Sequence, residues 1–297
     1  MTAIFVGGSQ RSGTTLVQTI LCASGATNPM IGEAKYFRQL VQAYAFGKRQ
    51  FSGETRDYFK DLEELRVFHG GLIQRFLDHT LARFEGAKHL VLKEPHLTML
   101  FPELVELLPA ARFICVVRDP RDVIASMIEV GRKLDEKGIA DDPMGRMFVR
   151  RDMRALSRHY LSFYLPALRS ADSGFMERYL FLRYEDLVQK PDEAMKQVAA
   201  FTGLEIAGLD ATADPGTGEV DFEKVNEYRK AWATKLYGKK ADASRVGAFR
   251  KVLKPAEIAA VVQNCRGVMN RFKYPYGAGR AGQAGGRAGG PGAGKPH

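Results

Sequence analysis

The residues whose types and spacing suggest chemistry lie near the start of the chain, in the segment GSQRSGTT that covers residues 8–15. Its glycines have the G-x-x-x-x-G spacing of a phosphate-binding loop, and a buried-type apolar run, AIFV, precedes it. Enzymes that bind ATP or GTP carry a lysine after the second glycine, where this chain has Thr14. A different cation, Arg11, stands inside the loop. We therefore expect an anionic nucleotide whose second group differs from the β- and γ-phosphates of ATP or GTP, and we expect it to be held largely without magnesium.

The order of strand, glycine turn and helix explains why such a loop attracts an anion. The turn directs successive backbone N–H groups into one concavity, and a helix that begins at about Thr14 adds a partial positive charge. We expect Thr14 and Thr15 to cap this helix and to donate their hydroxyls to the anion. The alternative is a glycine turn with a Ser/Thr cap and no ligand.

Four short apolar segments are expected to form the sheet that positions this loop. They are bounded by polar or turn residues and are continuous rather than alternating, which is typical of parallel strands covered on both faces. The segments are Ala3–Gly7, His89–Leu92, Arg112–Val117 and Tyr179–Arg183.

Helical patterns lie between and after these strands. We expect helices at Thr98–Leu108, Asp122–Val130, Phe148–Leu168, Asp192–Thr202 and Pro255–Phe272. The alternation predicts an α/β fold of three layers, with a mostly parallel central sheet flanked by helices. We expect one domain over residues 1–276, in which residues 34–86 form a helical insertion.

The carboxyl ends of the expected strands select a common set of polar residues, because ligands of open α/β sheets bind at that edge. After the first strand comes the loop with Arg11, and the second is followed by Lys93 and His96. The third strand leads into Arg118, and the fourth into Tyr184. Polar groups that converge from four strands predict a site.

Charge and composition restrict the class of protein. The net charge of +10 suggests an anionic partner. Residues 277–297 contain nine glycines, three basic residues and no acid, which predicts a disordered tail. The first strand begins at once and no run of about 18 apolar residues occurs, so we expect a cytoplasmic protein without a membrane span. No His/Cys cluster has metal-ligand spacing, and therefore no metal is expected.

Four segments together resemble the sulfotransferases that use 3′-phosphoadenosine 5′-phosphosulfate (PAPS). They are QRSGTTL from Gln10, VRDPRDVIAS from Val117, RYEDLV from Arg183 with the later Pro191, and SRVGAFR from Ser244. The loop arginine and the segment LKEP, residues 92–95, resemble the tyrosylprotein and bacterial branch more than the cytosolic steroid and phenol branch.

The resemblance implies PAPS as co-substrate, no metal ion, and a role for each motif residue. Ser12, Gly13, Thr14 and Thr15 would supply donors to the phosphosulfate, which Arg11 would also hold. Arg118 and Ser126 would bind the 3′-phosphate, and Tyr184 would contact the adenine. The residues of a lid over the nucleotide would be Ser244, Arg245, Gly247 and Arg250. The alternatives are structural roles: an ion pair of Arg118 with Asp119 or Asp122, and one of Lys93 with Glu94.

Transfer to a hydroxyl also requires a base, for which two residues are candidates. By resemblance Lys93 contacts the transferring sulfonate, and Glu33 lies where tyrosylprotein-type enzymes carry a glutamate base. His96 is the rival base. The chain departs from the tyrosylprotein pattern at Ala34 and Lys35, which replace a second glutamate and a threonine.

The acceptor hydroxyl and the oligomeric state are left open by the sequence. Carbohydrate, small-molecule and peptide tyrosine hydroxyls all fit, and residues 34–86 are expected to line the acceptor site. Two other functions remain as alternatives. A P-loop nucleotide kinase or NTPase lacks support because the loop has no lysine. A non-catalytic polyanion or nucleic-acid binder is suggested by the basic charge and the Arg/Gly-rich tail, but no nucleic-acid partner is expected.

Overall fold

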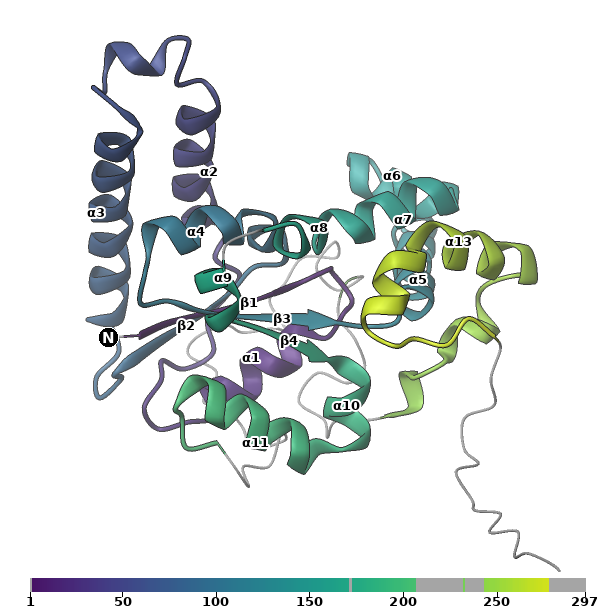
Figure 1. The fold of residues 1–297 in the computed structure, drawn as a ribbon. Coiled ribbons are helices and arrows are strands. Elements are labelled where there is room, and N and C mark those ends of the chain that lie inside the picture. Colours follow the sequence, from purple (N-terminus) through teal and green to yellow (C-terminus); the bar gives the residue numbers. More distant parts are fainter. Residues whose placement is uncertain (1, 171–172, 207–231, 233–242, 278–297) are drawn as a thin grey trace, which may run out of the picture.

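A four-stranded parallel sheet lies at the centre of the molecule (Figure 1). The computed structural model describes residues 2–170, 173–206, 232 and 243–277. The strand order is β2-β1-β3-β4, so β1 pairs with both β2 and β3. The strands are β1 (Thr2–Gly8), β2 (His89–Lys93), β3 (Arg112–Val117) and β4 (Tyr179–Arg183). The expected α/β fold with a parallel sheet is confirmed, and β1 and β2 each extend beyond their predicted ends.

Helices cover both faces of the sheet, because the strand residues alternate between two apolar clusters. Ile4 and Val6 of β1 pack in the cluster beneath helices α1 (Thr14–Cys22), α10 (Tyr184–Gln189) and α11 (Pro191–Thr202). Phe5 points to the other face, where its ring stacks on Phe37 at 5.4 Å and on Phe113 at 5.5 Å. Continuous apolar strands are the consequence of burial on both faces.

The remaining elements follow the order expected for a doubly wound domain. On the second face and beyond the carboxyl edge lie α2 (Lys35–Arg49), η1 (Thr55–Asp57), α3 (Leu62–Leu81), η2 (Pro95–Leu100), α4 (Phe101–Leu107), α5 (Pro120–Glu136), α6 (Pro143–Arg150), α7 (Met153–Ser162), α8 (Leu165–Leu168), α9 (Ser173–Glu177), η4 (Ala243–Arg245), η5 (Ala248–Lys251) and α13 (Pro255–Arg271).

The prediction of one long helix over Phe148–Leu168 is wrong, because three helices share this region. Arg151 has a left-handed backbone with φ of 52°, which ends α6. The carboxylate of Asp152 then accepts hydrogen bonds from two backbone N–H groups and starts α7. The resulting turns bring α7 and the following Tyr164 to the loop after β1, where the hydroxyl of Tyr164 accepts a hydrogen bond from Ser9 N at 3.1 Å.

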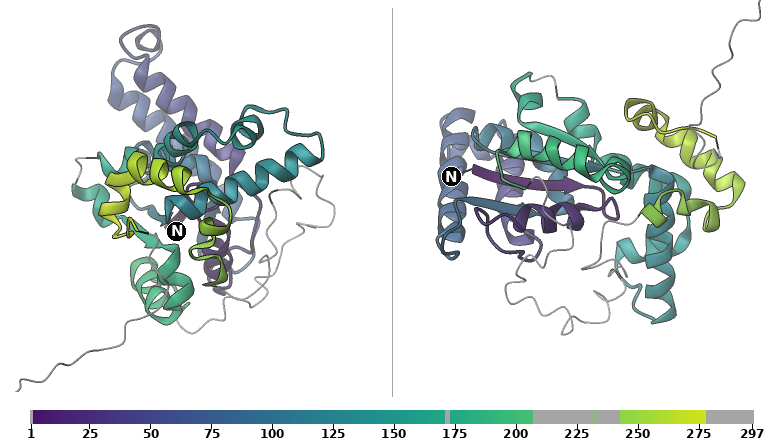
Figure 2. Two further views of the ribbon diagram at one scale, coloured as in Figure 1. Left: turned by 90° about the vertical axis from the view of Figure 1, so that its right-hand side faces the viewer. Right: turned by 90° about the horizontal axis from the view of Figure 1, so that it is seen from below.

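Helices α2 and α3 form a hairpin that stands away from the sheet (Figures 1 and 2). The hairpin carries large apolar side chains that remain exposed, among them Tyr36, Phe46 and Phe68. Among the helices described, none is both long and apolar enough to cross a membrane. The tail from residue 278 onward, for which we predicted disorder, lies outside the described residues.

Candidate functional site

The loop after β1 is held in a shape that only particular residues allow. Gly8 and Gly13 have φ of 131° and 103°, and Arg11 has φ of 70°. A Cβ atom on Gly13 would lie 2.6 Å from the ring of Tyr184, so glycine is required there for both backbone and space. Gly8 N donates to Thr98 Oγ1 at 2.7 Å, which fixes the start of the loop to η2.

Helix α1 begins without a side-chain cap. Its N-cap is Gly13, which differs from our expectation that Thr14 and Thr15 cap the helix. Thr14 is buried and Thr15 is half-buried, both within the first turn. The first backbone N–H groups of any helix lack partners inside the helix, so the start of α1 presents donors and a partial positive charge to the loop.

Three arginines meet beside this helix start. The guanidinium of Arg118 donates to Arg11 O at 3.1 Å and to Arg245 O at 2.7 Å, and thereby joins two segments far apart in sequence. Arg11 Nε donates to Ser126 Oγ at 3.0 Å. Burial, together with the positive charges of Arg118 and Arg245, lowers the pKa of Arg11 to about 10, although Glu129 opposes this effect. The cluster is therefore rich in positive charge.

The expected lid residues lie in and around η4 and η5. Arg245 pairs with Glu129 of α5 at 3.4 Å. Arg250 is exposed, donates to Gly247 O at 3.2 Å and stacks on Phe249. Ser244 is an exposed residue of η4. The structure thus places the basic segment 243–251 next to α5 and against Arg118.

Tyr184, which follows β4, is buried between the loop and Arg118. The guanidinium carbon of Arg118 lies 4.4 Å from the centre of the Tyr184 ring, close enough for a cation–π contact. The same ring packs against Gly13. Tyr184 therefore shapes both the loop and the position of Arg118, whereas its predicted contact with adenine stays a prediction.

Asp119 and Asp122, the acids that could have neutralised Arg118, have other partners. Asp119 forms an ion pair with Arg121 at 2.6 Å. Asp122 accepts hydrogen bonds from the backbone of Gly247 and Phe249. The alternative that pairs Arg118 with one of these carboxylates is therefore not the arrangement found.

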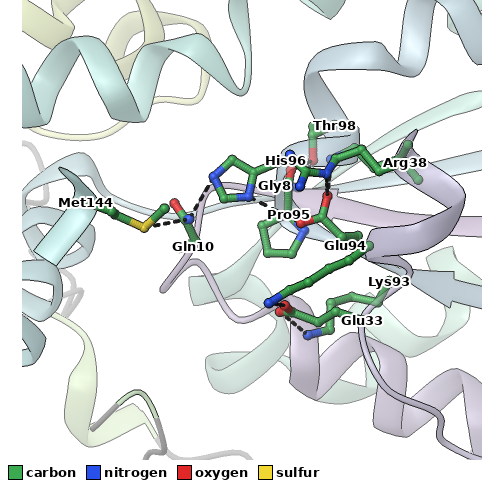
Figure 3. A network of polar contacts seen from close by, with 12 residues as sticks. Gly8, Gln10, Glu33, Arg38, Lys93, Glu94, Pro95, His96, Thr98 and Met144 are labelled. Atoms are coloured by element: carbon green, nitrogen blue, oxygen red, sulfur yellow. Dashed lines mark hydrogen bonds and ion pairs between the residues drawn. The ribbon is translucent and has the colours of Figure 1, made fainter. Parts of the chain in front are cut away.

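Lys93 and Glu33 form the polar pair at the end of β2 (Figure 3). Lys93 Nζ lies 3.0 Å from Glu33 Oε1, and Lys35 Nζ lies 3.4 Å from Oε2. Burial by itself would raise the pKa of Glu33, but Lys93 and Lys35 more than offset it, so this pKa is lower than usual. Glu33 is consequently ionised at neutral pH and remains partly exposed.

His96 belongs to a hydrogen-bonded chain that sequence reasoning missed (Figure 3). Its Nδ1 lies 3.2 Å from Glu94 Oε1, and its Nε2 lies 3.1 Å from Gln10 Nε2. On the other side, Gln10 Oε1 lies 2.8 Å from His159 Nε2. The amide nitrogen of Gln10 is a donor, so His96 Nε2 accepts and Nδ1 donates to Glu94.

This series of hydrogen bonds affects His159 and Glu94. Burial, and then the nearby charge of His96, lower the pKa of His159 to about 4. Glu94 is fully occupied by His96, by Leu97 N at 2.6 Å and by Arg38 at 3.5 Å, so it is not the partner of Lys93. The one signal in the sequence for the position of Gln10 was that it directly precedes Arg11.

Among the residues described, no group of three or more His, Cys, Asp or Glu side chains is placed to hold a metal ion. The charged groups around the loop are mainly arginine and lysine. This donor set suits phosphate or sulfate oxygens rather than a cation.

Comparison with known proteins places these features in a family. Residues 3–208 match the family described as the sulfotransferase family, and this match covers β1 to β4 with the loop, Lys93 and Arg118. The chain belongs to the sulfotransferase family.

The individual sulfotransferases that match this chain share only about a third of their aligned residues with it. A candidate protein-tyrosine sulfotransferase of Caenorhabditis briggsae is 30% identical over 211 residues, 68% of this chain and 65% of that protein. Carbohydrate sulfotransferase 5 of Mus musculus is 32% identical over 204 residues, 63% of this chain and 48% of that protein. The chain thus spans about half to two thirds of the length of these relatives.

A solved structure of the same fold supports the architecture. The sulfotransferase domain from the curacin biosynthetic pathway superposes with a TM-score of 0.54 and 20% identity, over 92% of this chain and 97% of that domain. At this level of identity the likeness concerns the fold.

Proposed function

We propose that the protein transfers a sulfonate group from PAPS to a hydroxyl group of an acceptor. The observation that carries this proposal is the cluster of Arg11, Arg118 and Arg245 at the open N-terminus of α1. Like charges held together with partial burial raise the free energy of the site, and an anion with several negative groups relieves that repulsion. PAPS has such groups at both its 5′ and 3′ positions.

The described residues fit the two ends of this nucleotide. The phosphosulfate suits the loop and the start of α1, where Arg11 and backbone N–H groups lie together. The 3′-phosphate suits Arg118 and Ser126, which both contact Arg11, and Arg118 also contacts the lid. Arg118 is buried, and its Nε has no hydrogen-bond partner among the described residues, so this guanidinium retains a donor for a phosphate oxygen.

The chemistry requires three roles from the chain. The acceptor oxygen forms a bond to sulfur while the bond from sulfur to the bridging phosphate oxygen breaks, and adenosine 3′,5′-bisphosphate leaves. Arg11 and Lys93 stabilise the negative charge that develops on the leaving group. Glu33 accepts the hydroxyl proton of the acceptor, for which its ionised state and partial exposure are suited.

The contacts of His96 favour Glu33 as the base. Both ring nitrogens of His96 are engaged, one by Glu94 and one by Gln10, so its basic lone pair is occupied. Glu33 contacts Lys93 directly, which keeps proton acceptance and charge stabilisation side by side.

The acceptor binds next to Glu33 in this proposal, at the start of the hairpin formed by residues 34–86. Tyr36 lies in the first turn of α2, two residues after Ala34, and its ring is exposed. The relatives named above act, by name, on protein tyrosine and on carbohydrate, and both provide the hydroxyl that the reaction needs.

Two measurements test the proposal. Calorimetry should detect binding of adenosine 3′,5′-bisphosphate without divalent metal and little binding of ATP with magnesium. Incubation with PAPS and pooled alcohols, phenols, sugars and tyrosine peptides should yield an acceptor that has gained SO₃ by mass spectrometry. Uptake of ATP with magnesium in place of the bisphosphate would contradict the proposal.

A further inference from the structure

Polar side chains spaced four residues apart connect the start of α5 to both parts of the nucleotide site. Arg118, just before α5, donates to carbonyl groups of the loop and of the lid. Ser126 accepts a hydrogen bond from Arg11. Asp122 lies midway between them in sequence, and Asp122 and Ser126, four residues apart, share one face of α5. The family resemblance assigned roles to Arg118 and Ser126 but none to Asp122.

The carboxylate of Asp122 is surrounded by the backbone of the lid. Oδ2 accepts a hydrogen bond from Gly247 N at 2.7 Å, and Oδ1 accepts one from Phe249 N at 2.9 Å. The residue is only 2% exposed. Gly247 has φ of 77°, a backbone shape that turns the chain around the carboxylate. Both oxygens are therefore used to hold segment 243–251.

The charges nearby explain why a carboxylate is required there. Segment 243–251 brings Arg245 toward Arg118 and Arg11, which repel it. Burial and the nearby charge of Asp119 raise the pKa of Asp122, and the positive charge of Arg118 and the two lid N–H groups offset only part of this rise. A negative charge at this point offsets part of the repulsion among the guanidinium groups.

We propose that Asp122 is a positioning residue, which folds the lid segment 243–251 around its carboxylate and so holds Arg245 beside Arg118 at the 3′-phosphate site. This inference rests on the proposed function. Asp122 makes no contact with the nucleotide itself, because both carboxylate oxygens are occupied by the lid and the side chain is buried. Its effect is expected in selectivity for the 3′-phosphate.

The competing explanation is a structural one. A carboxylate in the first turn of a helix interacts favourably with the helix dipole. Its loss would destabilise α5 without a specific effect on ligand binding. If the role is structural, replacement of Asp122 lowers thermal stability and weakens the binding of all adenosine nucleotides alike. If Asp122 positions the lid, its replacement weakens the binding of ligands with a 3′-phosphate more than that of ligands without it.

The test compares Asp122→Asn with the unmodified chain and with Asp152→Asn. Asp152 is a matched control because its carboxylate also accepts from two backbone N–H groups, at 2.9 and 3.1 Å, but within α7. Calorimetry measures the affinity for adenosine 3′,5′-bisphosphate and for adenosine 5′-monophosphate. In Asp122→Asn we expect the affinity for the bisphosphate to fall roughly tenfold or more, and the affinity for the monophosphate to fall less than about threefold. The control should bind both nucleotides with near-normal affinity.

Hydrogen exchange provides a second readout that needs no ligand. The amides of Gly247 and Phe249 should be protected in the unmodified protein and should lose protection in Asp122→Asn. Equal loss for both nucleotides, no loss, or unprotected amides in a chain that binds the bisphosphate would overturn the role of Asp122. Failure of the unmodified chain to bind the bisphosphate would instead refute the proposed function, and this inference with it.

Discussion

The ammonium of Lys93 lies 3.0 Å from Glu33 Oε1, so the last residue of β2 is tied to the segment that leads into α2. The two residues are separated by 60 positions, and the hydrogen bond from Ala34 N to Lys93 O at 3.0 Å keeps their backbones adjacent. Proton acceptance and charge stabilisation are thus assigned to side chains in direct contact.

Replacement of the carboxylate of Glu33 tests its role as base. In Glu33→Gln we expect turnover of the identified acceptor to fall by about 100-fold or more, because the amide cannot accept the hydroxyl proton. Affinity for adenosine 3′,5′-bisphosphate should change little. Steady-state kinetics and calorimetry measure the two effects, with Glu63→Gln, at an exposed position of α3, as the control. Full turnover in Glu33→Gln would transfer the role of base to His96.

Removal of the Arg118 side chain should affect the 3′-phosphate specifically. In Arg118→Ala we expect PAPS to bind about 10- to 100-fold more weakly, since hydrogen bonds to charged groups are lost. Adenosine 5′-phosphosulfate, which lacks the 3′-phosphate, should lose far less. Competition binding of both compounds measures the difference. Arg132→Ala is the control, because this exposed arginine of α5 pairs only at 3.5 Å with Glu136. Equal losses for both compounds would refute the assignment.

His159 should make the stability of the protein depend on mildly acidic pH. Its pKa falls from 6.5 to about 4 in the folded chain, first through burial and then through His96. The unfolded chain therefore binds a proton that the folded chain does not, and the free energy of unfolding decreases as the pH falls from about 6.5 toward 4.

The variant His159→Gln keeps a donor for Gln10 but does not titrate. Its free energy of unfolding, measured with urea at several pH values, should decline less steeply over this interval. The difference in slope should correspond to the uptake of up to about one proton on unfolding. Parallel pH profiles for the two proteins would show that His159 is not the group responsible.

Gly13 should tolerate no side chain. In Gly13→Ala the new Cβ meets the Tyr184 ring at 2.6 Å while φ remains near 103°, so we expect a loss of about 1–3 kcal/mol in stability. Binding of the bisphosphate should weaken as the loop shifts. Thermal unfolding and calorimetry measure both, against Gly25→Ala, where nothing lies within 4 Å. An unchanged Gly13→Ala protein would mean that the loop relaxes freely.

Much of the fold was predictable because its signals are local. Continuous apolar runs identified all four strands of the described sheet, and the glycine spacing after the first strand located the loop. The rule that parallel strands end at one edge then grouped Arg11, Lys93 and Arg118. The region 148–168 was not predictable in this way, because its apolar pattern continues across the breaks at Arg151 and Asp152.

The sequence by itself determined the positions of the strands along the chain, the loop with its cation, and the residues that reach the carboxyl edge, since each depends on neighbouring residues in the chain. Only the tertiary structure decided which distant polar groups meet: Lys93 with Glu33, and Asp122 with the backbone of the lid. Ion pairs and hydrogen bonds act over a few ångströms, and those distances arise from the packing of elements that lie far apart in sequence.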